Sequence, residues 1–170
     1  MSYMRQEYAD TVEPLGPPTW ITVHWTAGGY DQVFDHYHFN VKGNGDIVQT
    51  LSVRQKGSHT WHRNGGNLGV SFCAMAPGCP VKPAQIEAMA RMIAELMGIF
   101  KIPLGNVKDH VYWAKLDGYG PGSGDPQTRI DITGTSDGQK IWDTLMKRIP
   151  ELRQQLQAKT IANGLVGRIN

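Results

Sequence analysis

One segment settles the class of fold, and it is PAQIEAMARMIAELMGIF at residues 83–100. Its apolar side chains recur at the spacing of one helix face, and they are Ile86, Met89, Ala90, Ile93, Leu96, Met97 and Phe100. A helix with an apolar face needs an apolar surface to pack against. We therefore expect a helix from Pro83 that covers one face of a β-sheet.

Segments of strand-like composition lie on both sides of this helix in the sequence. The first is WITVH at residues 20–24, which combines β-branched and aromatic residues after the Pro17-Pro18 break. Four more are expected at residues 37–42, 46–51, 68–75 and 106–113. Gly43-Asn44-Gly45 separates the first two of these four and favours a hairpin, because an Asn-Gly step tolerates positive φ. The strand at 68–75 should be interior, because both of its faces are apolar or small.

A second apolar stripe at helical spacing lies in the C-terminal part, from Gln139 onward. Its members are Ile141, Leu145, Ile149, Leu152 and Leu156. Pro150 either kinks this helix or begins a new one. Before it, DGYGPGSGDP at residues 117–126 is typical of a turn-rich loop. Strands that alternate with one strong helix and a helical tail predict a single α/β domain, with a central mixed sheet flanked by helices.

The overall composition narrows the class of protein further. The 170 residues carry 17 basic and 15 acidic side chains, so the net charge of +2 does not favour nucleic acid as a partner. The first residues lack the apolar core of a signal peptide, and no stretch approaches the roughly 18 apolar residues of a membrane-spanning helix. We expect a soluble protein without a signal peptide. Cys73 and Cys79 are expected to be ordinary thiols, with a local disulfide as the alternative.

Six histidines suggest a metal site, and they are His24, His36, His38, His59, His62 and His110. They form no dense ligand motif such as HExxH. In a strand, His36 and His38 would share one face and Tyr37 would point to the other, so a site that uses Tyr37 would not readily use both histidines. The residues alone leave open which histidines act together.

Four separated segments, read in order, resemble one known family. They are VHWTAG at 23–28, YHFNVKGNGD at 37–46, GSHTWHRNGGNLGVSF at 57–72, and DH at 109–110 followed by DPQTRID at 125–131. In kind, order and spacing they are similar to the zinc N-acetylmuramoyl-L-alanine amidases. That family includes phage lysozymes of the amidase type, bacterial wall-recycling amidases and animal peptidoglycan recognition proteins. The resemblance covers residues 20–132.

The resemblance implies a site for one Zn²⁺. The matching ligands are His24, His110 and Asp125, and two imidazoles with one carboxylate leave a fourth position for water, as a catalytic zinc site requires. The loop after His110 is longer than in close relatives and also contains Asp117, while Asp131 follows shortly after it. Asp125 is preferred because it precedes Pro126 and stands six residues before Asp131, the spacing seen in members that use Asp.

Other site residues also follow from the resemblance. Tyr37 matches the family tyrosine whose hydroxyl lies near the metal and is the predicted catalytic residue; the alternative is an aromatic core residue. The predicted substrate-binding residues are His59, Trp25, Trp61, His62 and Asn64, with His62 as an alternative to His59 for the family histidine. Ser71 and Ser123 stand where wall-recycling members have a Glu and a Lys, so those two roles are not carried over.

The implied activity is zinc-dependent hydrolysis of the amide bond between N-acetylmuramic acid and L-alanine in bacterial peptidoglycan. The predicted organisation is an N-terminal extension at 1–19, a zinc amidase core at 20–136, and a C-terminal helical segment at 137–170 packed on the same domain. We expect a monomeric endolysin that is made in the host cytoplasm and acts on the wall in the periplasm after release. The alternatives are a cytoplasmic wall-recycling amidase and a non-catalytic peptidoglycan-binding module.

The C-terminal segment suggests one further contact. Basic residues accompany its apolar stripe, namely Lys147, Arg148, Arg153, Lys159 and Arg168. This pattern allows a weak contact with an anionic membrane. The alternative is a helix packed on the domain with a solvated basic face.

Overall fold

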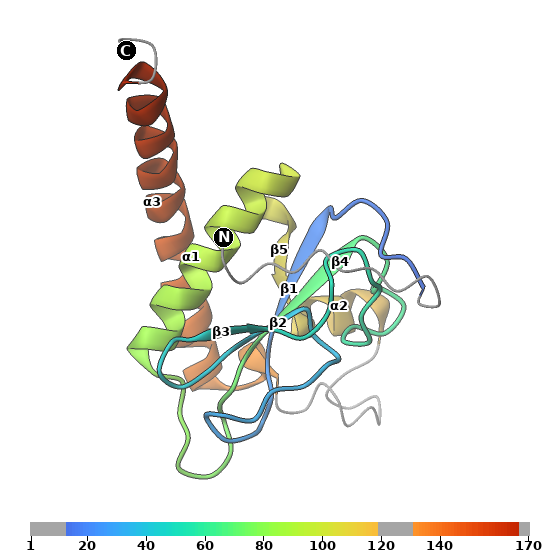
Figure 1. The fold of residues 1–170 in the computed structure, drawn as a ribbon. Helices are drawn as coiled ribbons and strands as arrows, with labels where there is room; N and C mark the ends of the chain where they lie inside the picture. Colours follow the sequence, from blue (N-terminus) through green and yellow to red (C-terminus); the bar gives the residue numbers. More distant parts are fainter. Residues whose placement is uncertain (1–12, 119–130, 167–170) are drawn as a thin grey trace.

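The computed structural model describes residues 13–118 and 131–166, and these form one mixed five-stranded sheet with helices packed against it (Figure 1). The strands are β1 (Trp20–Trp25), β2 (Phe39–Val41), β3 (Ile47–Gln49), β4 (Asn67–Phe72) and β5 (Val107–Asp109). The helices are α1 (Pro83–Phe100), α2 (His110–Asp117) and α3 (Ser136–Val166), with two short 3₁₀ helices, η1 (Leu104–Asn106) and η3 (Ile132–Gly134). The predicted α/β class with a mixed sheet is confirmed.

The sheet has the strand order β3-β2-β4-β1-β5. β4 and β1 are central and parallel, and β2 and β5 flank them, also in parallel. β3 adds an antiparallel edge through a hairpin with β2, and Gly45 in its turn has a φ of 90°, as the Asn-Gly step predicts. The interior position predicted for the strand around residues 68–75 is confirmed, because every residue of β4 is buried.

The two faces of the sheet differ in character because successive side chains of a strand point to opposite faces. One face carries Ile21 and Val23 of β1, which belong to the hydrophobic core together with the alternate residues of β2 and β4. The neighbours of these residues on the other face are polar and buried, and they are Thr22, His24, His38, Asn40, Asn67 and Ser71. The polar face must therefore satisfy its hydrogen bonds within the protein.

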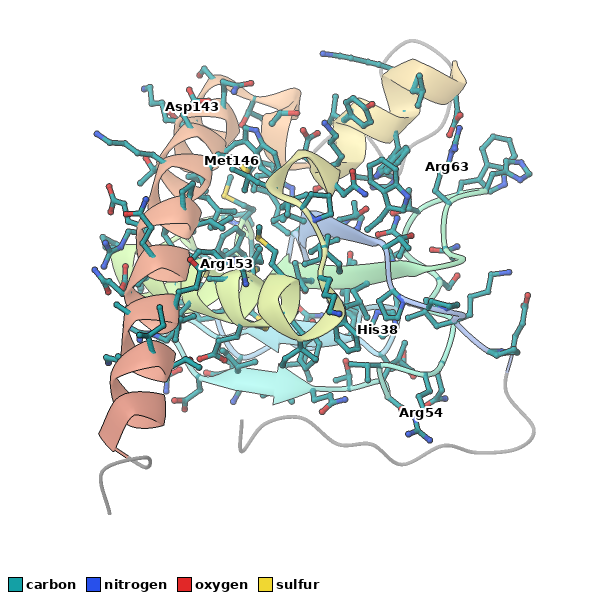
Figure 2. All side chains as sticks on the ribbon, turned by 90° about the horizontal axis from the view of Figure 1, so that it is seen from above. His38, Arg54, Arg63, Asp143, Met146 and Arg153 are labelled. Carbon is teal, nitrogen blue, oxygen red and sulfur yellow. The ribbon has the colours of Figure 1, made fainter. Side chains whose placement is uncertain are left out.

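α1 lies between the sheet and α3. Buried residues occur around most of its circumference, and they are Gln85, Met89, Ala90, Met92, Ile93, Ala94, Leu96 and Met97. The buried side chains of α3, namely Leu145, Ile149 and Leu152, join the same core cluster. In Figure 2, Met146 of α3 points inward and Asp143 points outward. α3 continues through Pro150 as one helix, so Pro150 does not begin a new one.

The expectation of strand structure for residues 106–113 is correct only for the first part. β5 ends at Asp109, and His110 begins α2. The cause is local: the Asp109 carboxylate accepts a hydrogen bond from the backbone N–H of Tyr112 and so caps the helix. The apolar residues that suggested a strand serve α2 instead, where Val111 and Trp113 are buried.

The segment before β1 is packed on the domain. Leu15 is buried in the core, and its backbone pairs with Arg54 and Gly66. The boundaries predicted at residues 19 and 136 remain predictions. Among the described residues, no helix has the length and apolar character needed to span a bilayer. Both Cys73 and Cys79 are free thiols.

Candidate metal centre

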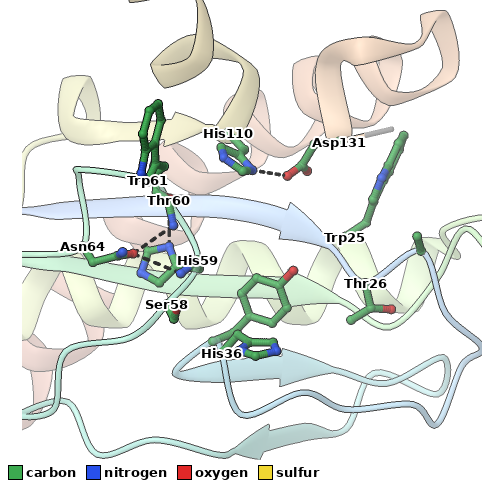
Figure 3. A pocket seen from close by; sticks show the side chains of 12 residues that line it. Trp25, Thr26, His36, Ser58, His59, Thr60, Trp61, Asn64, His110 and Asp131 are labelled. Carbon is green, nitrogen blue, oxygen red and sulfur yellow. Dashed lines mark hydrogen bonds and ion pairs between the residues drawn. The ribbon is translucent and has the colours of Figure 1, made fainter. Parts of the chain in front are cut away.

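Three buried side chains converge at one end of the polar face: His24, His110 and Asp131. His24 Nδ1 lies 3.0 Å from Asp131 Oδ2, and His110 Nδ1 lies 2.7 Å from the same oxygen. One ligand atom from each residue can be chosen so that all lie within 4.8 Å of one another. The contact between His110 and Asp131 is visible in Figure 3.

The topology of the sheet explains why these residues meet. Val23 pairs with Asp109 across the parallel strands β1 and β5, so the next residues, His24 in β1 and His110 at the beginning of α2, lie side by side. Asp109 also accepts a hydrogen bond of 2.8 Å from Thr133 Oγ1, which ties the beginning of α2 to η3. Asp131 directly precedes η3, and its Oδ1 accepts a hydrogen bond from Ile132 N. The cluster thus combines two positions held by the sheet with one held by η3.

The electrostatics of the cluster favour neutral imidazole and ionised carboxylate. Burial lowers the pKa of His24, although Asp131 opposes this. Burial alone would raise the pKa of Asp131, but the adjacent His24 and His110 outweigh it and hold the pKa below its usual range. Two neutral imidazole nitrogens and one carboxylate oxygen are a donor set that zinc accepts. The residues present therefore fit a zinc ion.

His59 lies directly behind His24. Its Nδ1 is 3.2 Å from His24 Nε2 and 2.9 Å from Thr60 Oγ1, and its Nε2 is 3.1 Å from the carbonyl oxygen of Asn67. A Cβ at Gly69 would lie 2.5 Å from the His59 ring, so the ring occupies space that only glycine leaves open. Burial lowers the pKa of His59 well below its ordinary value. His59 is therefore part of the floor of the site.

Tyr37 stands beside the cluster, with its ring centroid 5.0 Å from that of His24. Burial raises the pKa of its hydroxyl, which keeps the group protonated and able to donate a hydrogen bond at neutral pH. The backbone of this segment is held by Thr50, whose hydroxyl donates to the Tyr37 carbonyl at 2.7 Å. Asn40 binds both Phe34 N and Phe34 O and so fixes the approach to Tyr37.

The cluster opens into a cavity of about 400 Å³ (Figure 3). Its lining includes four of the predicted substrate-binding residues, namely Trp25, His59, Trp61 and Asn64. Trp61 is 56% exposed, whereas Trp25 is almost fully buried. The Asn64 side chain accepts hydrogen bonds from His59 N and Thr60 N, so it shapes the loop. His62 does not line the cavity, but its ring lies 4.1 Å from that of Trp61. The substrate roles of all five stay predictions.

Three acidic residues were candidates for the third metal ligand, and the structure treats them differently. Asp125, the preferred one, lies outside the described residues, so its role stays a prediction. Asp117 forms an ion pair with Arg63 at the end of α2. Asp131 is the carboxylate that the described structure brings to His24 and His110.

The remaining polar residues of the site face have structural partners. His38 contacts Gln55 O through Nε2 and accepts a hydrogen bond from Gly69 N through Nδ1. Both ring nitrogens of His38 thus have partners within the protein, so His36 and His38 do not act as a pair in the site. Ser71 donates to Asn40 at 2.8 Å, so the position where wall-recycling members have a Glu holds a neutral hydrogen-bonded pair. Sequence reasoning missed the roles of Thr60 and Asp109; the only signal for Asp109 was an acidic residue directly before His110.

Fold and cluster together define a class: a mixed α/β domain with a His-His-Asp centre, able to hold a metal ion, at the end of its central strand. The Amidase_2 family model, N-acetylmuramoyl-L-alanine amidase, matches residues 14–128. The chain belongs to this family.

Solved structures support the fold. The chain is similar to a mutant endolysin from Bacillus subtilis, with 20% identity over 86% of this chain and 97% of that one and a TM-score of 0.57. It is also similar to the Ph2119 endolysin from the Thermus scotoductus MAT2119 bacteriophage, with 19% identity, 62% and 80% coverage and a TM-score of 0.54. A third similar structure is the N-acetylmuramoyl-L-alanine amidase LysC from Clostridium intestinale URNW. It has 19% identity over 65% of this chain and 81% of that one, with a TM-score of 0.53. No curated protein matches the chain at a significant level.

Proposed function

We propose that this chain is a zinc-dependent N-acetylmuramoyl-L-alanine amidase that cleaves the bond between N-acetylmuramic acid and L-alanine in bacterial peptidoglycan. The observation that carries the proposal is the buried convergence of His24, His110 and Asp131 beneath an open cavity. Membership of the amidase family supplies the bond that is cleaved. Asp131 is the third ligand in this proposal.

Each part of the site has a task in amide hydrolysis. A zinc ion held by the three ligands supplies a lowered pKa for a water molecule and polarisation of the scissile carbonyl. The lowered pKa of Asp131 keeps its carboxylate ionised, and the lowered pKa of His24 favours its neutral imidazole, which are the protonation states that metal ligands need. All three side chains are almost fully buried, and His110 and Asp131 also line the cavity.

Tyr37 is the side chain proposed to act on the substrate. Its hydroxyl keeps its proton at neutral pH, because burial raises its pKa, and can donate a hydrogen bond to the carbonyl oxygen as negative charge develops there. His59 does not protonate the leaving nitrogen, because hydrogen-bonding partners within the protein occupy both of its ring nitrogens. Trp61, exposed at the rim, offers an aromatic face to a sugar ring.

The proposal is tested by incubating purified sacculi with the protein and measuring new L-alanine amino termini. Wild-type protein should release them, a zinc chelator should stop the release, and added zinc should restore it. His110→Ala should be inactive while folded, and Tyr37→Phe should lose about 100-fold in rate. Full activity in the presence of the chelator, or in the His110→Ala variant, would contradict the zinc mechanism. A protein that sediments with sacculi but releases nothing would be a binding module instead.

The biological setting is part of the proposal. We infer a wall-lytic enzyme, an endolysin made in the cytoplasm of the host that reaches the wall after release. The similar folds of several endolysins support this setting, and the neutral Ser71–Asn40 pair separates the chain from the recycling amidases. Comparing the rates on intact sacculi and on soluble wall fragments tests it. A strong preference for soluble fragments would favour the recycling enzyme.

A further inference from the structure

The inner nitrogen of His24 faces two groups of the loop after β3. His24 Nε2 lies 3.2 Å from His59 Nδ1 and 3.5 Å from Thr60 Oγ1. Its other nitrogen, Nδ1, lies 3.0 Å from Asp131 Oδ2. Which nitrogen of His24 carries the hydrogen decides which one has a lone pair for a metal ion.

The surroundings of His59 determine where its own hydrogen lies. A carbonyl oxygen can only accept, so the contact of 3.1 Å to Asn67 O requires the hydrogen on His59 Nε2. A neutral His59 then presents a lone pair at Nδ1. Thr60 Oγ1 lies 2.9 Å from this nitrogen, and its own lone pairs can also accept a hydrogen.

The same reasoning extends to His24. If His24 Nε2 lacked a hydrogen, two lone pairs would face each other across 3.2 Å between His24 and His59. With the hydrogen on Nε2, both neighbours, His59 Nδ1 and Thr60 Oγ1, can accept it. His24 Nδ1 then has its lone pair directed to the same place as the carboxylate oxygen of Asp131, an arrangement that a cation satisfies.

We propose that His59 is a positioning residue that accepts the hydrogen of His24 Nε2 and so presents His24 Nδ1 to the metal ion. This inference rests on the proposed function for the identity of the metal, and it assigns His59 a role other than substrate binding. His59 touches no reacting atom in this role. It acts through the orientation and basicity of His24.

The niche around His59 is built for a fixed ring. Added Cβ atoms at Gly57 and Gly69 would lie 2.8 Å and 2.5 Å from the ring, so the ring occupies space that these two glycines leave open. The loop that carries His59 is pinned by Asn64, whose Oδ1 accepts from His59 N and Thr60 N at 3.0 Å and 2.8 Å. The contacts of both ring nitrogens, with Thr60 and with Asn67 O, distinguish His59 from a merely space-filling residue.

Zinc affinity in the absence of substrate tests the proposal. His59→Leu removes the acceptor, and we expect zinc to bind about 10- to 100-fold more weakly in competition with a chelating dye. His59→Asn retains an oxygen at the position of Nδ1 and should recover most of the affinity. His62→Asn removes an imidazole from the same loop and should bind zinc like wild type. Equal affinity in His59→Leu and wild type would overturn the proposal, as would a failure of His59→Asn to exceed His59→Leu.

A second measurement does not depend on whether a variant folds. Long-range ¹H–¹⁵N spectra of the wild-type protein report which nitrogen of each histidine carries the hydrogen. We expect His24 to be protonated at Nε2 and ligated through Nδ1 in the zinc-loaded protein. Ligation through Nε2 would contradict the inference and leave the amidase proposal intact. If the wild-type protein binds no zinc, the proposed function fails, and the spectra still report the hydrogen of His24.

Discussion

The two faces of the central sheet are built from the same strands but carry side chains of opposite character, apolar on one face and polar on the other. Ile21 and Val23 belong to the hydrophobic core on one face, where side chains of this kind pack without any hydrogen bond. Their neighbours Thr22 and His24 lie on the other face, where the side chains form specific hydrogen bonds. Stability should therefore be concentrated on the apolar face and chemistry on the polar face, so substitutions on the two faces should change different observables.

The largest effect is expected for the carboxylate of the metal centre. Asp131→Asn removes the ionised ligand, and the amidase rate should fall on the order of 10³-fold or more together with zinc binding. Asp117→Asn is the matched control, because Asp117 pairs with Arg63 instead. Rate and zinc stoichiometry should be measured for both. Asp125→Asn belongs to the same series: loss of zinc there, with zinc retained in Asp131→Asn, would make Asp125 the third ligand.

A substitution on the apolar side should change stability and leave chemistry alone. Ile93→Ala opens a cavity in α1, where Ile93 is fully buried in the core, and should cost about 2–5 kcal/mol in the free energy of unfolding. Urea denaturation measures this cost. The rate per folded molecule should stay within about twofold of wild type. Arg91→Ala, on the exposed side of the same helix, should cost less than about 1 kcal/mol; a large fall in rate for Ile93→Ala would show that the faces are not separate.

The buried polar face should also make stability depend on pH. Burial lowers the pKa of His38 from 6.5 to about 4, so protonation at His38 favours the unfolded chain. This contribution is fully present above pH 6.5 and is lost as the pH falls from 6.5 through 4, by up to about 3 kcal/mol. In His38→Gln the free energy of unfolding should fall less steeply over that range. Parallel curves for the two proteins would exclude His38 as the source.

The smallest effect is expected for a polar contact that faces water. Arg148 of α3 holds Glu87 of α1 through two hydrogen bonds, but both side chains are partly exposed. Glu87→Gln should change the free energy of unfolding by less than about 1 kcal/mol, and high salt should reduce even that difference. A larger loss in urea denaturation would mean that the pair acts as a buried contact.

The elements predicted best from the sequence were those with a strong periodic pattern. α1 was recognisable because its apolar residues repeat at helical spacing, and the β2–β3 hairpin because Asn44-Gly45 suits a tight turn. The mistake at His110 arose because apolar residues around it suit either a strand or a helix, and the capping carboxylate of Asp109 decides between them.

The candidate site was only partly accessible from the sequence. His24, Tyr37 and His110 were identified through motifs, and the structure brings them together. The position of Asp131 beside His24 and His110 depends on tertiary packing, which spacing within a loop does not encode. The contact of His59 with His24 depends on Gly69, a residue of β4 whose missing side chain makes room for the ring. Such a contact exists only after the strands are paired.

Two basic residues of the C-terminal segment have partners within the protein. Arg148 binds Glu87 and Glu151, and Arg153 donates to the carbonyl oxygen of Ala94. Figure 2 shows Arg153 lying beside α1. These two cations hold α3 on the domain, so the weak membrane contact predicted for this segment would depend on its other basic residues.

The placement of Asp131 has a consequence for the energetics of the whole chain. Two of the three candidate ligands, His24 and His110, stand at or near the ends of paired strands, while the third, Asp131, directly precedes η3 and α3. An ion bound by all three would act as a reversible crosslink between the sheet and the C-terminal helical layer. If the proposed function is correct, the melting temperature should depend on zinc. It should rise with the free concentration of the ion and fall when a chelator is added.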